Sequence, residues 1–211
     1  MPLSPAIIGT GATPLERHSH ATAAEVALAA SLAALAEAGL RPADLDGYVG
    51  CFEAPNPGAA HHDGIDEVSA EYMCGALGLA NARVVIDLPQ MALGIGLLQS
   101  AAAAILAGEA RRVLVLRALV HDDRVTYSLN ARRTAGGEDQ FTLPFGLGKG
   151  GGRQALWWRR YLHDHGLAED AIYPVIANAR RNARNNPRAH WRAAEVPTRE
   201  AFLQSRYIYA P

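Results

Sequence analysis

The sequence is poor in cysteine, in lysine and in aromatic residues. Its two cysteines, Cys51 and Cys74, are too few for the disulfide framework of a small secreted domain. Lys149 is the single lysine, so the positive charge comes almost entirely from arginine. The formal net charge of -1 gives the whole molecule no attraction to nucleic acid. Hydrophobic residues make up 49% of the 211 residues, which is enough for a substantial core.

Signals for export and for membrane insertion are also missing. The opening residues MPLSPAIIGTG contain no basic segment and no long apolar run, so we expect a cytoplasmic protein without a signal peptide. No charged residue occurs from Leu88 to Gly108, a length that would suit a membrane span. Pro89 and Gln90 begin this stretch, glycine and alanine dominate it, and no aromatic belt flanks it. A buried helix is therefore the better interpretation.

Charge is distributed unevenly along the chain. Residues 1–150 contain 10 basic and 16 acidic residues, whereas residues 151–211 contain 10 and 5. This change predicts two structural units that meet near Gly146–Gly152. A long irregular segment begins at residue 122, so we divide the chain into a core of residues 1–121 and a loop or cap region of residues 122–211.

The hydrophobic pattern predicts an alternation of strands and helices. Four short runs are interpreted as strands: Pro5–Gly9, Gly47–Phe52, Arg83–Asp87 and Arg112–Val120. Further helices are predicted at Glu67–Leu79, Gln154–His165, Ala171–Arg184 and Arg199–Ser205. Met91–Ala107 is predicted to be a central helix buried on all sides, whose small residues let other backbones approach closely. This order of elements is typical of a layered α/β fold.

The first helix has clear signals at both ends. Thr22 and Glu25 fit a capping box, in which each side chain satisfies the other's free backbone amide. Gly39 is a suitable C-terminal stop, because glycine adopts the left-handed conformation without strain. Three leucines at helical spacing predict the buried face: Leu28, Leu32 and Leu35.

Two glycine-rich segments fall short of nucleotide-binding motifs. Gly9-Thr10-Gly11 follows a predicted strand, but Pro14 stands where the dinucleotide fingerprint needs a small residue. In GLGKG, Gly150 replaces the Ser or Thr with which a P-loop holds magnesium. The segment is more readily interpreted as a hinge.

Other candidate sites are weaker still. The histidine pairs His18/His20, His61/His62 and His163/His165 lack the additional ligands of a known metal site and are interpreted as surface residues. Cys51 and Cys74 have no neighbouring base in the sequence, so buried thiols are favoured over nucleophiles.

The arginine-rich stretch RRNARNNPRAHWR leaves three interpretations open. Arg180, Arg181 and Arg184 suit a phosphorylated small molecule, because guanidinium groups bind phosphate through paired hydrogen bonds. A nucleic-acid site and a solvated or subunit-contacting helix face are the alternatives.

Five segments together resemble the thiolase superfamily, in particular its sterol-carrier or lipid-transfer branch, which includes aldolases of steroid side-chain degradation. They are AIIGTGATPLER, LAALAEAGLRPADLDGYVGC, ALGIGLLQSAAAAILAGEARRVLVLRA, FTLPFGLGKGGGRQALWWRRYLHDHGLAED and ANARRNARNNPRAHW. The resemblance covers nearly the whole chain but only the N-terminal half of such a protein. It implies a thiolase-like α/β half-fold, with a mixed sheet, a buried central helix and a helical loop region.

The same resemblance gives expectations for the site. The family's nucleophilic cysteine corresponds to Met91, whose thioether forms no acyl-thioester, and a motif glycine corresponds to Gly94. Acyl-pocket positions fall on Pro144, Phe145 and Gly146, next to Met91 and Gly94. Coenzyme A would be bound as the thioester substrate by Arg180, Arg181 and Arg184, with no other cofactor and no metal. Tyr127 is a weak candidate for a catalytic group, because the family's acid–base residues lie in the other half.

Three functions remain open at this point. The leading hypothesis is an aldolase-type component that breaks a C–C bond beside an acyl-CoA thioester. A non-catalytic scaffold of a thiolase-like complex and an acyltransferase are the alternatives. The resemblance implies a homodimer or hetero-oligomer, with a C-terminal thiolase half or an OB-like domain as partner, and neither nucleic acid nor a membrane span.

Overall fold

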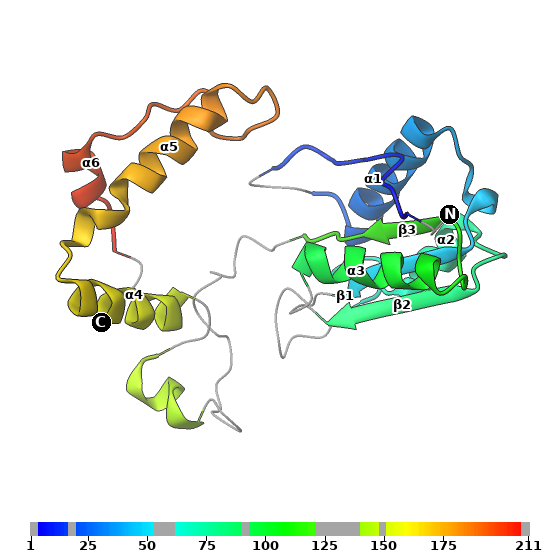
Figure 1. Ribbon diagram of the computed structural model, residues 1–211, viewed down its shortest axis with the longest axis horizontal. Helices are drawn as coiled ribbons and strands as arrows, with labels where there is room; N and C mark the ends of the chain where they lie inside the picture. Colours follow the sequence, from blue (N-terminus) through cyan, green and yellow to red (C-terminus); the bar gives the residue numbers. More distant parts are fainter. Residues whose placement is uncertain are drawn as a thin grey trace. The chain divides into compact units, whose positions relative to one another are not determined.

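The computed structural model describes residues 4–16, 20–52, 62–89, 93–120, 140–147 and 151–207. The chain divides into two compact units (Figure 1). The first comprises Met1–Thr13 and His18–Asp122, and the second comprises Pro14–Arg17 and Asp123–Pro211.

A three-stranded parallel sheet forms the centre of the first unit. Strand β1 (Gly47–Phe52) lies between β2 (Val84–Pro89) and β3 (Val113–Leu116). In the register, Gly47 is opposite both Val84 and Val113. The α/β class is confirmed, and all described strands are parallel, so an antiparallel member of a mixed sheet is not among them.

Helices cover both faces of this sheet. Helices α1 (Ala23–Ala38) and α2 (Ala70–Leu77) pack on one face, where Tyr48 and Leu114 join their core. Helix α3 (Leu93–Leu106) packs on the other, against Val49 and its neighbours (Figure 1). Because successive residues of a strand point to opposite faces, β1 serves both cores. A short 3-10 turn, η1 (Pro42–Asp44), leads into β1.

Helix α1 begins and ends as its sequence predicts. Thr22 and Glu25 form the complete capping box, and Gly39 closes the helix with φ 67°. The predicted buried face is wrong in one position, because Leu32 is 51% exposed. Four small residues and one leucine are buried instead: Ala23, Ala24, Ala27, Ser31 and Leu35. Small side chains bring the helix backbone closer to its neighbours than leucine would allow.

Two further predictions for the first unit need correction. Residues Pro5–Gly9 are not in a strand, and Ile7 and Ile8 are 69% and 61% exposed. Helix α3 is not buried on all sides, since Ile95 is 73% and Leu106 is 56% exposed. Both features have a common cause: within the described residues, no element covers these apolar side chains.

The second unit consists of short helices with few buried residues. Its elements are η4 (Leu143–Phe145), α4 (Gly151–His165), η5 (Glu169–Ile172), α5 (Tyr173–Arg184) and α6 (Arg199–Leu203). The buried residues of its helices are Gly152, Leu162, Asp170 and Ala177. An ion pair between Asp170 and Arg199 connects η5 to α6.

None of the helices that the structure describes is long and apolar enough to cross a membrane.

Candidate active site

The carboxyl ends of the parallel strands and the start of α3 form the candidate site of the first unit. Strand β2 ends at Pro89, and α3 begins at Leu93. Ligands of open α/β sheets commonly bind at the carboxyl ends of the strands. The first turn of a helix adds free backbone amides and a partial positive charge. Such a place can stabilise a developing oxyanion.

Gly94 lies in the first turn of α3 with open space beside it. Among the residues that the structure describes, a Cβ atom added at this glycine would meet no heavy atom of a neighbouring element within 4 Å. Gly94 itself is exposed. Met91, the predicted equivalent of the family nucleophile, lies outside the described residues, and its role stays a prediction.

Cys51 occupies a buried position under the same helix. It lies opposite Leu88 in the register and is only 3% exposed. Its side chain belongs to the cluster of Leu97 and Ala101. At this buried position the sulfur is out of reach of a substrate. This environment is that of a structural thiol.

Cys74 is equally unsuited to nucleophilic attack. Burial, and then the nearby carboxylate of Asp87, raise the pKa of the Cys74 thiol above its ordinary value. The thiol therefore stays protonated at neutral pH. Both cysteines thus argue against acyl-enzyme formation, which the acyltransferase hypothesis requires.

A polar cluster on the opposite face of the sheet was not predicted from the sequence. Asp87 Oδ2 accepts a hydrogen bond of 2.6 Å from the backbone N–H of Ala70, the first residue of α2. A Cβ at Gly50 would lie 2.7 Å from the Tyr48 hydroxyl and 2.9 Å from Asp87 Oδ1, so glycine makes room for both side chains. Burial, and then Asp87, raise the pKa of Tyr48, which keeps the phenol neutral. The cluster faces α2 rather than α3, and its clear role is to fix α2 to the sheet.

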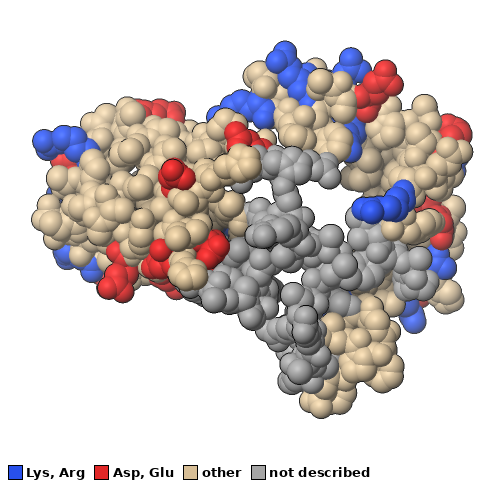
Figure 2. All heavy atoms as spheres, turned by 180° about the vertical axis from the view of Figure 1, so that it is seen from behind, with Lys and Arg blue, Asp and Glu red and all other residues tan. Residues whose placement is uncertain are grey.

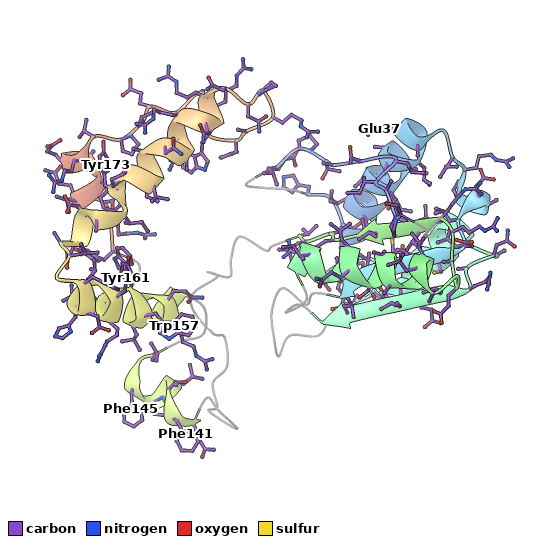
Figure 3. All side chains as sticks on the ribbon, viewed as in Figure 1. Glu37, Phe141, Phe145, Trp157, Tyr161 and Tyr173 are labelled. Carbon is purple, nitrogen blue, oxygen red and sulfur yellow. The ribbon has the colours of Figure 1, made fainter. Side chains whose placement is uncertain are left out.

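The predicted acyl-pocket residues of the second unit form an exposed turn. Pro144 and Phe145 belong to η4, and Gly146 ends it with φ 80°. The N–H of Gly146 donates to the carbonyl of Leu143 at 3.0 Å. This tight turn leaves the Phe145 ring 82% exposed (Figure 3).

Other aromatic side chains of this unit are exposed as well. Phe141 is 74% and Trp157 70% exposed (Figure 3). On α4, the rings of Trp158 and Tyr161 stack at 5.6 Å between centroids. Flat apolar surfaces of this kind suit a polycyclic acyl group or a protein partner.

The predicted CoA-binding arginines share helix α5 but differ in environment. The guanidinium of Arg180 lies 3.6 Å from the centroid of the Trp191 ring, a cation–π contact. Arg181 and Arg184 are exposed in the last turn of α5. Basic side chains stand on the surface of this unit (blue in Figure 2). Arg181 and Arg184 are thus accessible to phosphate, while one face of Arg180 is already occupied.

The predicted site residues are divided between the units. Gly94 belongs to the first unit, whereas η4 and α5 belong to the second. Tyr127 lies outside the described residues. Among those that the structure describes, no group of three His, Cys, Asp or Glu side chains could hold a metal ion.

Comparison with known proteins supports the thiolase-like resemblance. A steroid side-chain-cleaving aldolase of Thermomonospora curvata is 32% identical over 100% of this chain and 52% of its own length. A 17-hydroxy-3-oxo-4-pregnene-20-carboxyl-CoA lyase of Mycobacterium tuberculosis is 29% identical over 98% of this chain and 52% of its own length. The chain therefore spans about half the length of the curated relatives it matches. No family model matches the chain.

Solved structures agree with this relationship. The solved structure of an Ltp2-ChsH2(DUF35) aldolase superposes with a TM-score of 0.75 at 28% identity, covering 98% of this chain and 50% of that one. The chain is thiolase-like in fold and resembles the steroid-aldolase branch. An acetyl-CoA acetyltransferase of Syntrophomonas wolfei superposes with a TM-score of 0.55 at 18% identity, covering 85% of this chain and 46% of that one. At this identity the similarity concerns the fold and not the function. The resemblance stated from the sequence is confirmed.

Proposed function

We propose that this thiolase-like chain is one component of a cytoplasmic acyl-CoA lyase that breaks a C–C bond by retro-aldol cleavage. The observation that carries the proposal is the match along its whole length to proteins named as a steroid side-chain aldolase and an acyl-CoA lyase. The same relatives are about twice as long as these 211 residues, so our proposal includes further polypeptide in the active enzyme.

The reaction class defines what the site must do. A base removes the proton of a β-hydroxyl group, the bond between the α and β carbons breaks, and a ketone leaves. The electron pair moves into the thioester as an enolate, and protonation of the α carbon gives a shorter acyl-CoA. The enolate oxygen needs hydrogen-bond donors where its charge develops.

This chain supplies three parts of such a site in our proposal. The open first turn of α3 at Gly94 supports the enolate oxygen with backbone amides. Arg181 and Arg184 bind the phosphates of coenzyme A. Phe145 contacts the apolar acyl group. The base belongs to polypeptide outside this chain, and the partner is a thiolase C-terminal half or an OB-like-domain chain.

The experiment is a reconstitution. The chain is co-expressed with the part of the Thermomonospora relative that it does not match, with and without an OB-like-domain chain. The purified complex is incubated with a β-hydroxyacyl-CoA whose cleavage would release a polycyclic ketone. We expect equal amounts of ketone and shortened acyl-CoA by mass spectrometry. An assembled complex that releases neither product refutes the lyase proposal.

Matched variants test the CoA role. Replacing both Arg181 and Arg184 by Ala should raise KM by about tenfold with little change in kcat, because charged hydrogen bonds to phosphate are lost. Arg192→Ala, on the same unit, is the control and should leave KM unchanged. Equal effects of the two changes would refute the assignment.

A non-catalytic scaffold is the second candidate function. The state of both thiols favours it over an acyltransferase, because Cys51 is buried and the pKa of Cys74 is raised. An active complex that keeps full turnover when the Gly94 turn is blocked by Gly94→Val would support the scaffold.

A further inference from the structure

Helix α5 of the second unit is followed by a segment that turns back along the helix and carries Trp191 (Figure 1). The side-chain oxygen of Asn186 accepts a hydrogen bond of 3.0 Å from the backbone N–H of Arg188. The carbonyl of Asn186 accepts another from the N–H of Ala189 at 3.1 Å. The N–H of Arg192 then donates to the carbonyl of Ala189 at 3.0 Å. These consecutive turns define the backbone on both sides of Trp191.

The same segment is also attached to the beginning of α5. The hydroxyl of Tyr173, the first residue of the helix, donates to the carbonyl of Pro197 at 3.1 Å. The Tyr173 ring also contacts the ring of Phe202, with 5.9 Å between their centroids. The position of Trp191 is therefore set by contacts at both ends of α5 and does not depend on its own side chain alone.

The Trp191 ring is held in a defined orientation while much of it stays accessible. The guanidinium of Arg180 lies over the ring at 3.6 Å from the centroid. The His190 ring meets it at an interplanar angle of 87°, with 5.6 Å between centroids. Trp191 is nevertheless 49% exposed. A half-exposed indole in a fixed orientation is a flat surface on which another planar group can stack.

Positive charge without a partner lies next to this ring. Three ion pairs neutralise arginines of α4 and α6: Arg159–Glu169, Arg160–Asp164 and Arg199–Asp170. Among the residues that the structure describes, no carboxylate pairs with Arg181 or Arg184 at the end of α5. Unpaired guanidinium groups bind phosphate through charged hydrogen bonds.

The spacing of the ring and the charges suits a nucleotide. Arg180, which contacts Trp191, and Arg184 are four residues apart on α5. Residues at this spacing are neighbours on one side of a helix, with Cβ atoms about 5–6 Å apart. In a nucleotide, a single ribose separates the flat base from the phosphates. A base on Trp191 therefore leaves its phosphates close to the last turn of α5.

We propose that the exposed surface of Trp191 is a stacking platform for a purine nucleotide, and that this nucleotide is the one in coenzyme A. The proposal rests on the proposed function, which assigns Arg181 and Arg184 to the phosphates of coenzyme A, and it adds a residue that binds the base. Aromatic stacking accepts every base, so the platform distinguishes a nucleotide from a phosphate alone. Arg180 is a positioning residue, because it holds the indole from the side that the base does not use.

The test is a binding experiment with the full chain of 211 residues and three probes, which are coenzyme A, ADP and pyrophosphate. Affinities are measured by calorimetry, and tryptophan fluorescence is recorded in parallel. We expect coenzyme A and ADP to quench the fluorescence of Trp191 on binding, since a stacked base lies against the indole. Pyrophosphate should bind more weakly and without quenching.

Substitutions separate the base from the phosphates. Trp191→Ala should weaken coenzyme A and ADP about tenfold and leave pyrophosphate unchanged, because only stacking is lost. Trp191→Phe should restore most of this affinity. Replacing both Arg181 and Arg184 by Ala should weaken all three probes. Trp157→Ala, at a tryptophan of the same unit that is 70% exposed, is the matched control and should bind like the unchanged chain.

Four results would overturn the platform. They are no binding of coenzyme A, equal binding by Trp191→Ala and the unchanged chain, equal loss of pyrophosphate and coenzyme A in Trp191→Ala, and tighter binding of ADP than of coenzyme A. The third would mean that Trp191 only supports the fold of the segment, and the fourth that coenzyme A is not the ligand. Because the measurement requires no turnover, binding that depends on Trp191 in an inactive complex supports the platform and refutes only the lyase proposal.

Discussion

The close contact between Gly11 and α1 makes Gly11→Ala a sharp perturbation. The new Cβ would lie 2.0 Å from Ala30 O and 2.6 Å from the backbone N of Ala34. Carbon atoms normally stay about 3.5 Å or more from non-bonded neighbours, so a displacement of more than an ångström is required. The neighbours are backbone atoms inside a helix and cannot rotate away. The segment before Gly11 must therefore leave α1.

The cost follows from the same geometry. Overpacking of a close contact costs about 1–3 kcal/mol of stability. The loss cannot exceed the free energy needed to release the segment before Gly11 from α1. Denaturant unfolding should show this loss, and hydrogen exchange at residues 5–11 should accelerate. Gly75→Ala is the control, since its Cβ meets no atom of the described residues within 4 Å and alanine in a helix is favoured over glycine by about 0.5–1 kcal/mol. Replacement of glycine by alanine should thus lower the free energy of unfolding at Gly11 and raise it at Gly75. Unchanged stability and unchanged exchange in Gly11→Ala would refute the contact.

Three further predictions concern individual side chains. The raised pKa of Tyr48 means that this phenol ionises at lower pH in the unfolded chain than in the folded chain, so the stability that it contributes is present below about pH 10 and is lost at higher pH. Tyr48→Phe should therefore reduce the loss of unfolding free energy between pH 8 and 11, as measured by urea unfolding. An unchanged dependence of this free energy on pH would contradict the burial of the phenol. The raised pKa of Cys74 predicts that iodoacetamide modifies this thiol more slowly in the folded than in the unfolded chain at pH 8. Equal rates in the two states would contradict the raised pKa. Arg180→Gln should shift the fluorescence of Trp191 and cost no more than about 1 kcal/mol, because the pair is partly exposed; an unaltered spectrum would argue against the cation–π contact.

Features set by neighbouring residues could be predicted from the sequence. The capping box of Thr22 and Glu25 and the stop at Gly39 involve only a few residues of local backbone. The strands at the centre of the sheet were located to within a few residues for the same reason, since each is a short apolar run. The sequence predicts the central helix at Met91–Ala107, and the structure shows it at Leu93–Leu106.

Features set by distant contacts could not be predicted. The buried face of α1 includes Ser31 instead of Leu32, a choice that depends on what packs against the helix. Tyr48 and Asp87 meet only because the parallel register places Gly50 opposite Asp87. A signal was present in the glycine two residues after the tyrosine, but its meaning depends on the pairing of the strand.

The predicted site combines features that depend on neighbouring residues with features that depend on distant contacts. The sequence predicts Gly94 near the start of the central helix, and the structure shows it in the first turn of α3. The roles of Pro144, Phe145, Gly146 and the three α5 arginines stay predictions, because they depend on contacts with a bound substrate.

The order of strands in the sheet also has a consequence for the growing polypeptide. Asp46, just before β1, accepts hydrogen bonds from the backbone N–H groups of Arg111 and Arg112 at 2.9 and 2.7 Å. These partners are 65 and 66 residues away in the chain. During synthesis β1 therefore waits for both of its neighbours, first β2 and then β3, while its apolar side chains have no sheet to join. Parallel pairing over such separations is slow and exposes strand edges to aggregation. We expect the nascent chain to require protection by a chaperone until β3 has emerged from the ribosome.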